Sequence, residues 1–304
     1  MRARRQNSLC IAFAAIWAIR PIPAISDAPA DFIVETIERS FTVQGRPALR
    51  VKNAEGRIRI VAGKQPQVQI RAIKEVRGAS SIEDARQYAD RIHVRIEQNG
   101  SRIQAEATYP SMNRFPFGRE PEALVHLEII APMSSDLEAS NADGEIQLEG
   151  IEGKIKAQTA DGKLSIVNCS GQIESRTADG DLRVQGAAGD VSAKTSDGSV
   201  SIDGVFQALN AVSGDGRMII KVIPGSKMMN DWSIRSGGGN IRVSLPEDFA
   251  ADLDASTGDG RIRVDYPVSS ERARSENKLT GKLNAGGRLL RIRTGDGDIT
   301  IEKQ

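Results

Sequence analysis

Residues 141–216 repeat one pattern with a step of 18 positions. In rows of 18 from residue 141 they read NADGEIQLEGIEGKIKAQ, TADGKLSIVNCSGQIESR, TADGDLRVQGAAGDVSAK and TSDGSVSIDGVFQALNAV, and a fifth row opens with SGDG. The second and fourth residues after each glycine of these turns are apolar, which predicts a β-strand with one buried face. A fixed step over consecutive rows indicates stacked units rather than a compact globule.

The four-residue turn recurs outside these rows. It stands at Asn53-Ala-Glu-Gly56, Ser236-Gly-Gly-Gly239, Thr257-Gly-Asp-Gly260 and Thr294-Gly-Asp-Gly297. Asp-Gly favours a tight turn, because the Asp side chain bonds the nearby backbone and Gly accepts a positive φ. We therefore expect structural turns at Asp143, Gly144, Asp161, Gly162, Asp179, Gly180, Asp197, Gly198, Asp215, Gly216, Asp259, Gly260, Asp296 and Gly297.

Each row also holds a second, shorter apolar strand, such as Ile155/Ala157, and Gly150, Gly186 and Gly204 mark the opposite turn. Units of two strands and two turns predict an all-β fold: a single-stranded β-helix, or solenoid, for which we expect a right-handed coil. A sandwich of antiparallel hairpins is the alternative, because Asp-Gly also suits hairpins. The constant register over five turns favours the solenoid.

The preceding segment, residues 31–130, lacks the regular step and predicts a β-rich N-terminal cap before a repeat array over 131–304. Ser80-Ser-Ile-Glu83 fits a capping box that opens one short helix ending near Asp90. Strands are expected at 33–43, 49–61, 68–76, 92–96, 103–107 and 124–130.

Residues 1–26 predict a secretory signal peptide. Basic residues at the start precede the apolar run LCIAFAAIWAI at 9–19 and then small residues. That run is shorter than the roughly 20 residues that span a bilayer; a retained short anchor is the alternative. Cleavage would leave Cys169 as the only cysteine, so no internal disulfide is expected. We therefore expect an exported protein, periplasmic or associated with the cell surface.

Composition excludes several classes of function. The formal net charge of +1, which becomes −3 without the four arginines of the leader, gives no basic excess for nucleic acid. His93 and His126 stand without a Ser or Cys signature, so neither is expected to be catalytic. One Asp per unit is too few ligands for calcium, and no glycine turn has the Lys-Ser/Thr ending of a phosphate loop. We expect no cofactor and no metal.

Two segments are candidate partner contacts. The loop 111–121 gathers Arg114, Phe115, Phe117 and Arg119 between prolines, and aromatic and Arg side chains favour interface centres. Phenylalanines folded back onto the cap are an equal alternative. Met228, Met229 and Trp232 form a weaker second candidate.

With these motifs, the chain resembles the bacterial “putative adhesin” β-strand repeat family of exported proteins of unknown function. Its most specific parts are His126-Leu-Glu-Ile-Ile-Ala-Pro132, Ile241-Arg-Val-Ser-Leu-Pro246 and the final Gly-Asp-Gly-Asp-Ile. The resemblance implies a β-helical fold and an extracytoplasmic address, and it brings no catalytic residue.

The predicted function is a non-catalytic, adhesin-like or scaffold module of the cell envelope that recognises an envelope protein or glycan through loops on a rigid rod. A carbohydrate-active enzyme is the alternative, although the array between 141 and 220 holds one aromatic residue, Phe206, and no convergent carboxylates. A partner of an envelope-stress sensor is the third possibility.

Overall fold

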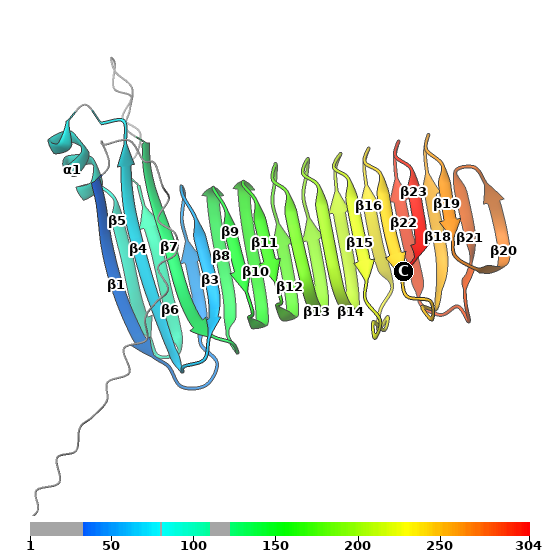
Figure 1. Cartoon of the computed structure of the whole chain (residues 1–304), viewed down its shortest axis with the longest axis horizontal. Helices are drawn as coiled ribbons and strands as arrows, with labels where there is room; N and C mark the ends of the chain where they lie inside the picture. The colour runs from blue at the N-terminus through cyan, green and yellow to red at the C-terminus, as the bar shows by residue number, and fades with distance from the viewer. Residues whose placement is uncertain (1–32, 80, 110–121) are drawn as a thin grey trace, which may run out of the picture.

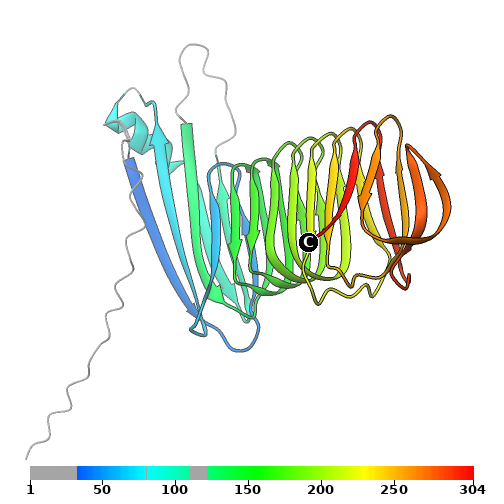
Figure 2. The same ribbon diagram turned by 45° about the vertical axis from the view of Figure 1, so that its right-hand side comes forward.

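The computed structural model describes residues 33–79, 81–109 and 122–304. In these residues it is an elongated β-solenoid of 23 strands and one short helix, α1 (Ile82–Asp90) (Figure 1). Two layers of strands face one another, and the chain passes between them at turns along two edges (Figure 2). We call a first-layer strand, its Asp-Gly-type turn and the following second-layer strand a rung. The predicted all-β solenoid, with a β-rich N-terminal cap that contains one short helix, is confirmed.

Pairing gives the spatial order of each layer. The first layer runs β5 (His93–Asn99), β6 (Arg102–Thr108), β2 (Ala48–Lys52), β8 (Asp136–Asp143), β10 (Glu152–Asp161), β12 (Ser170–Arg176), the later parts of β13 (Leu182–Lys194) and β14 (Val200–Ser213), β16 (Trp232–Ser236), β22 (Leu289–Thr294), β18 (Ala251–Thr257), β21 (Lys278–Leu283) and β20 (Val268–Ser275). The second runs β1 (Ile33–Thr42), β4 (Gln67–Arg77), β7 (Glu122–Pro132), β3 (Ile58–Gly63), β9 (Ile146–Glu149), β11 (Leu164–Val167), the earlier parts of β13 and β14, β15 (Met218–Val222), β17 (Ile241–Leu245), β23 (Ile299–Lys303) and β19 (Ile262–Asp265).

Neighbouring rungs of the array pair in parallel and in register. Leu164 of β11 lies between Ile146 of β9 and Leu182 of β13. Residues 18 apart are therefore side by side, about 4.8 Å from one another. Parallel pairing of successive repeats excludes the antiparallel sandwich.

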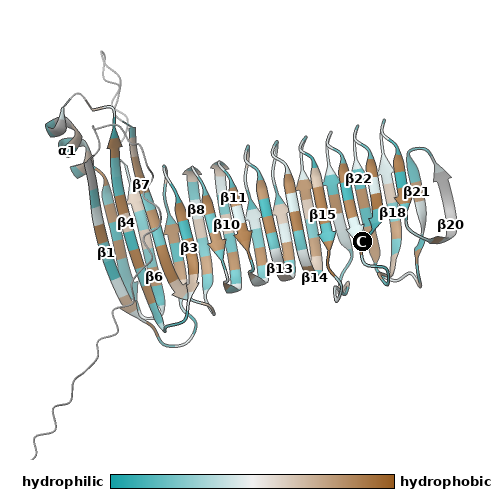
Figure 3. Ribbon diagram, in the orientation of Figure 1, coloured by the Kyte–Doolittle hydropathy of each residue, from teal (hydrophilic) through white to brown (hydrophobic). Residues whose placement is uncertain are grey.

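The interior is a set of apolar columns. Ile146, Leu148, Leu164 and Ile166 are at most 1% exposed, and the same positions of the other central rungs are also buried. Figure 3 shows the resulting alternation of hydrophobic and hydrophilic residues along the strands. Burial of these columns is the main favourable contribution to folding, at about 25 cal/mol per Å² of apolar surface.

Beyond residue 216 the order in space differs from the order in the chain. The rung β22–β23 lies between β16–β17 on one side and β18–β19 on the other. The antiparallel strands β21 and β20 then extend the first layer beyond β18. The step of 37 between the last two turns is therefore a detour through this hairpin before the chain returns to an inner place, which the repeat pattern did not predict.

The N-terminal end has the same kind of inversion. The rung β2–β3 lies between β8–β9 and the later strands β6 and β7. Antiparallel strands complete this end: β5 pairs with β6, β4 with β7 and β1 with β4. Lys74 of β4, 7% exposed, donates from Nζ to the Ala89 carbonyl of α1 at 3.3 Å and pairs with Glu35 at 2.9 Å. The division at residues 31–130 and 131–304 remains a prediction, and the first rung, 48–63, stacks directly on 136–149.

At most of the turns glycine is required for a reason that differs from the predicted one, whereas Gly56 (φ 107°) and Gly144 (φ 147°) do adopt the predicted positive φ. At Gly162, Gly180, Gly198 and Gly216 φ lies outside the left-handed range, so freedom of φ is not what selects glycine. A Cβ on Gly180 would instead overlap the Gly162 carbonyl group, and each following turn meets the one before it in the same way. Gly153, Gly171 and Gly189 form a second such column at the opposite edge.

Replacing one turn glycine tests this explanation. Gly180→Ala must displace the backbone of the adjacent turn, and we expect a loss of about 2–4 kcal/mol of unfolding free energy. Urea denaturation followed by circular dichroism measures it. The exposed Ser196→Ala in the next turn is the matched control and should change stability by less than about 0.5 kcal/mol; equal effects of the two substitutions would refute the close-packing explanation.

The side chain that holds each turn is the first residue of the motif, not the Asp. Thr195, 1% exposed, donates its hydroxyl to the Gly180 carbonyl at 3.2 Å and accepts from the Gly198 amide at 3.1 Å. Thr177, Ser213, Ser236 and Thr257 bond in the same way, while Asn141 donates to the Gly56 carbonyl at 2.7 Å. Among the described residues, Asp143, Asp161, Asp179, Asp197 and Asp215 have no side-chain hydrogen bond. The predicted Asx bonding is therefore wrong, because the carboxylates point to solvent while the hydroxyls face the stack.

Two substitutions in one turn separate these roles. Thr195→Val leaves the Gly198 amide and the Gly180 carbonyl without their buried partner and should cost about 1–3 kcal/mol. Asp197→Ala removes a solvated carboxylate and should change stability by less than about 0.5 kcal/mol. Chemical denaturation of both variants measures the change in unfolding free energy. Thr195→Ser keeps the hydroxyl, so it should retain most of the stability that Thr195→Val loses.

Candidate functional site

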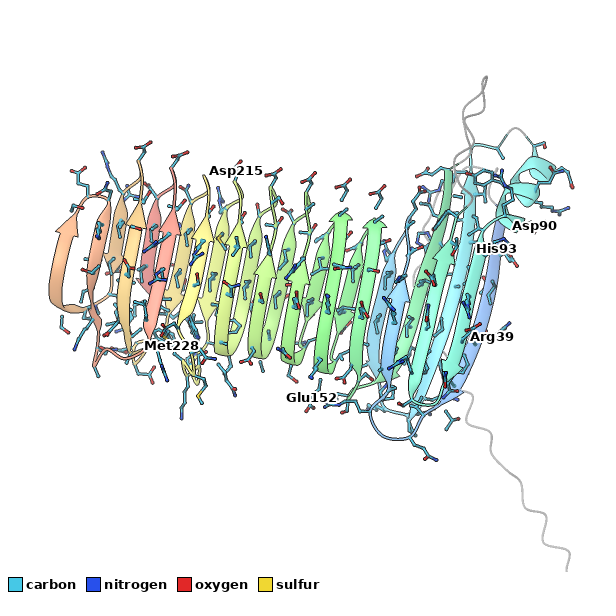
Figure 4. The ribbon with its side chains drawn as sticks, turned by 180° about the vertical axis from the view of Figure 1, so that it is seen from behind. Arg39, Asp90, His93, Glu152, Asp215 and Met228 are labelled. Carbon is cyan, nitrogen blue, oxygen red and sulfur yellow. The ribbon has the colours of Figure 1, made fainter. Side chains whose placement is uncertain are left out.

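The predicted turn residues lie along one edge of the rod. Seven exposed carboxylates follow this edge at the turns, from Asp143, Asp161, Asp179, Asp197, Asp215, Asp296 and Asp259. Figure 4 labels Asp215 at this edge and Glu152 at the opposite one. In the described part of the chain no three His, Cys, Asp or Glu side chains come together in a way that could hold a metal ion.

The predicted partner-contact loop lies outside the described residues, so Arg114, Phe115, Phe117 and Arg119 remain a prediction. The second candidate contact, Met228, Met229 and Trp232, does not form one surface in the structure. Trp232 is 1% exposed and packs between Phe206 and Phe249, at ring-centroid distances of 6.1 and 5.4 Å. It belongs to the core, because the insertion before β16 returns it to an inward position. Met228 packs partly against the core, and Met229 is 60% exposed.

In the part of the chain that the structure describes, no hydrogen bond joins either histidine to a Ser, Thr or Cys side chain. His126 accepts the Arg57 amide at Nδ1 (3.1 Å), and its Nε2 lies 3.2 Å from Glu75 Oε2. A neutral ring with its proton on Nε2 satisfies both contacts, so His126 ties β7 to β4 and to the first turn. His93 is exposed on β5. Cys169 is buried, and that burial raises the pKa of its thiol, which disfavours the reactive thiolate.

Two tyrosines secure the places where the chain departs from sequential order. Tyr109 donates to the Glu55 carbonyl at 2.6 Å and accepts the Val125 amide at 3.0 Å, which links the first turn to β7. Tyr266 contacts the carbonyls of Pro246 and Phe249 at 2.7 and 3.0 Å in the loop after β17. Burial raises the pKa of both hydroxyls. Neither role had a signal in the sequence, since both tyrosines lie outside the repeat pattern.

Glu55 occupies the Asp position of the first turn and is the described turn acid with a shifted pKa. Partial burial raises its pKa above the usual 4.5, and repulsion from Asp143 and Glu122 adds to the rise. The folded state therefore binds the Glu55 proton more tightly than the unfolded chain. Its stabilising contribution is present below pH 4.5 and is lost as pH rises through the folded pKa.

Glu55→Gln removes this pH dependence. At pH 7 the variant should be more stable than the parent, by about 0.5 kcal/mol or less because the group is mostly solvated. Below pH 4 the two proteins should converge. Thermal unfolding from pH 3.5 to 8 measures the difference; a variant that is less stable at pH 7 would contradict the repulsion, and Asp197→Asn is the control at a turn of the central array.

The outer face of the first layer carries a row of cations, which we call the basic row. Its members are Lys52, Ser140, Gln158, Arg176, Lys194, Val212, Arg235, Arg293, Ser256 and Lys278, each paired in register with the next. The first nine stand just before the turns, and Lys278 is the first residue of β21. Six of the ten are Lys or Arg and none is acidic. At its N-terminal end the row meets Glu106 of β6.

The cations of the basic row are solvated and largely uncommitted. Arg176 pairs with Glu174 at 2.8 Å and Arg293 with Asp254 at 3.3 Å, and both side chains are at least half exposed. Lys194 and Arg235 are exposed, and no ion pair joins either of them to another described residue. Arg235 and Arg293 are adjacent only because β22 is inserted beside β16.

The outer face of the second layer has fewer cations in its central rows. From β3 to β19 its row reads Arg59, Gln147, Ser165, Arg183, Ser201, Ile219, Arg242, Thr300 and Arg263. The row beside it holds four acids, Glu149, Asp203, Glu302 and Asp265, with one cation, Lys221. The two outer faces therefore differ in charge, and the first layer is the more cationic.

Other surfaces offer little for chemistry. An open depression of about 550 Å³ beside the β3–β4 turn is lined by residues 62–66 with Pro132 and Met133, and Lys64 is its single ionisable group. Within residues 33–79, 81–109 and 122–304, no helix has both the length and the apolar character needed to cross a membrane. The described surface thus presents long rows of side chains rather than a concave site.

A match to one protein-family model agrees with this architecture. The model of one protein family, described as Toastrack DUF4097, matches residues 48–302. The chain is similar to a solved “putative adhesin” from Parabacteroides merdae (9% identity, TM-score 0.42, 89% of this chain and 96% of that one). Another from Bacteroides fragilis (12%, 0.35, 89% and 97%) and a “putative cell adhesion protein” from Clostridium sporogenes (13%, 0.25, 89% and 100%) are also similar. No curated protein matches the chain.

Proposed function

The chain belongs to the DUF4097 family, and from that premise we propose that it is a non-catalytic, exported, adhesin-like rod that binds an extended anionic partner along its basic row. The observation that carries the proposal is the basic row itself: six cations at one height of the first layer, with no acid among its ten positions. The alternative of a carbohydrate-active enzyme requires carboxylates that converge in a concave site, whereas the seven turn aspartates are exposed along one edge.

The shape of the row favours a linear polymer over a compact ligand. Rungs repeat at about 4.8 Å, so cations on adjacent strands, such as Arg176 and Lys194, are separated by about that distance along the rod. A sugar residue of an extended polysaccharide has a similar length, and a polyuronate carries one carboxylate on each residue. A charged surface without a groove binds such a polymer through many weak contacts. The affinity for the polymer therefore falls as the salt concentration rises.

The test compares two variants that lose the same charge. Arg176→Gln/Lys194→Gln/Arg235→Gln/Arg293→Gln neutralises the basic row, and Arg59→Gln/Arg183→Gln/Arg242→Gln/Arg263→Gln neutralises four arginines of the second layer. Binding of polygalacturonate at low salt is measured by biolayer interferometry, with neutral dextran as the polymer control. We expect the first variant to bind at least about tenfold more weakly and the second to stay within about threefold of the parent. Equal losses would show that net charge, not the row, decides binding.

A cellular experiment tests the partner without assuming its identity. A photo-crosslinking amino acid at Gln158 or Val212, inside the basic row, should yield adducts in the envelope, and the same residue at Ser165 or Ser201 of the second layer should not. A glycan adduct supports the proposal. A discrete protein adduct would favour a sensor or scaffold partner instead, and the same probe at Phe115 and Phe117 tests the predicted loop.

A further inference from the structure

The outermost strand at the N-terminal end, β1, has one unpaired edge. It pairs antiparallel with β4 through ten residues without a bulge, and no other described strand pairs with its second side. Figure 1 shows β1 as the last strand at that end, with α1 against its upper part. It contains no proline, and most of its described side chains are exposed. A long, regular edge without a bulge or proline is a template for another strand.

The backbone groups that face this free edge can be identified. Val43 donates its amide to the Pro66 carbonyl at 3.1 Å, one step beyond the Thr42–Gln67 pair. In an antiparallel strand the N–H and C=O of one residue point to the same side, and successive residues alternate. The odd-numbered residues of β1 therefore bond to β4, and Thr36, Glu38, Ser40 and Thr42 direct their backbone groups to the edge that faces away from β4. Two of these carbonyls already accept from side chains of the same chain, that of Glu38 from Arg39 at 2.9 Å and that of Thr42 from Gln98 at 3.3 Å.

These directions limit how β1 can pair with a second copy of itself. An even-numbered residue must lie opposite an even-numbered one, and an odd-numbered residue opposite an odd-numbered one. The two-fold axis therefore passes through a residue position, where that residue lies opposite its own symmetry mate. An axis through Glu38 or Arg39 would place like charges opposite one another. An axis through Ile37 places Glu35 of each copy opposite Arg39 of the other, and Ile37 opposite its own symmetry mate. This register is self-complementary in charge.

The side chains in that register are at least partly exposed. Arg39 is exposed, donates to the Glu38 carbonyl at 2.9 Å, and forms no ion pair with another described residue. Glu35 contacts Lys74 at 2.9 Å while its side chain stays 48% exposed. Ile37 and Phe41 are only partly buried against the core. All of these lie at positions not hydrogen-bonded in the new pair, where opposing side chains are closest.

We propose that β1 pairs with β1 of a second copy about a two-fold axis through Ile37, which joins two solenoids at their N-terminal caps. The dimer continues the second layer from one copy into the other and places two Glu35–Arg39 ion pairs across the junction. This proposal is independent of the basic row, which lies on the first layer, so either can fail alone.

A cysteine at the axis tests the register in the full-length protein carrying Cys10→Ser, so that Cys169 is the one other thiol. In Ile37→Cys the two thiols are opposite one another across a pair whose Cα atoms are about 4.5 Å apart, within the range that a disulfide accepts. Mild oxidation should give a covalent dimer on non-reducing gels. Ser40→Cys is the matched control, because residue 40 lies opposite residue 34 of the partner. Cys169 is buried in both variants. If the Ile37→Cys variant cross-links no faster than the Ser40→Cys variant, the register is overturned.

Sedimentation velocity tests the dimer without a cross-link. Glu38→Pro removes an amide that faces the free edge and spares the bonds to β4, so the fold should persist while dimerisation weakens at least about tenfold. Arg39→Glu should weaken it by a similar factor through Glu35 repulsion, and Arg183→Glu in the middle of the rod should not. A parent protein that stays monomeric at high concentration, or a Glu38→Pro variant that dimerises as well as the parent, would overturn the proposal.

Discussion

The close approach of successive turns is the constraint on which the rest of the structure depends. At the turn edge each glycine lies against the carbonyl group of the glycine before it, and a buried Thr, Ser or Asn bonds both turns. Because this contact leaves no room for a side chain, it fixes the spacing and the register of the rungs together. Strands that could otherwise slide are held so that every inward residue meets its equivalent, and the apolar columns follow from that register.

Much of the fold follows from the repeated pattern. The 18-residue step predicted stacked rungs and buried Ile, Leu and Val positions, while apolar runs and a capping box in the preceding segment predicted the cap strands and the helix at Ile82–Asp90. Two local explanations were wrong because the sequence shows which residues recur, not which way they point: Thr195 bonds the turns while Asp197 faces solvent, and Gly180 is selected by close packing rather than by φ. The column of Gly153, Gly171 and Gly189 shares the same step and could have been found.

Neither the order of the rungs nor the candidate site could be predicted from the sequence, and the reason is the same for both. All copies of the motif have similar strands, so the sequence of one copy does not indicate which other copy it stacks on. The place of β22 beside β16 is set by long-range packing and by loop contacts such as those of Tyr266. The basic row depends on that order, since Arg235 and Arg293 are 58 positions apart in the chain and adjacent in space. A surface assembled across a detour of this kind is visible only in the structure.

The inner position of β22–β23 changes what loss of the C-terminal residues would mean. In an ordinary repeat protein, removal of the last unit shortens the array and exposes the next unit as a new end. Here residues 289–303 separate two rungs that contact them from both sides. In a chain that ended at residue 288, β18–β19 would lack its neighbouring rung on one side. The strand edges and the apolar columns that β22–β23 covers on both of its sides would then be exposed. Loss of this segment would therefore expose apolar surface in the interior of the rod rather than at its end.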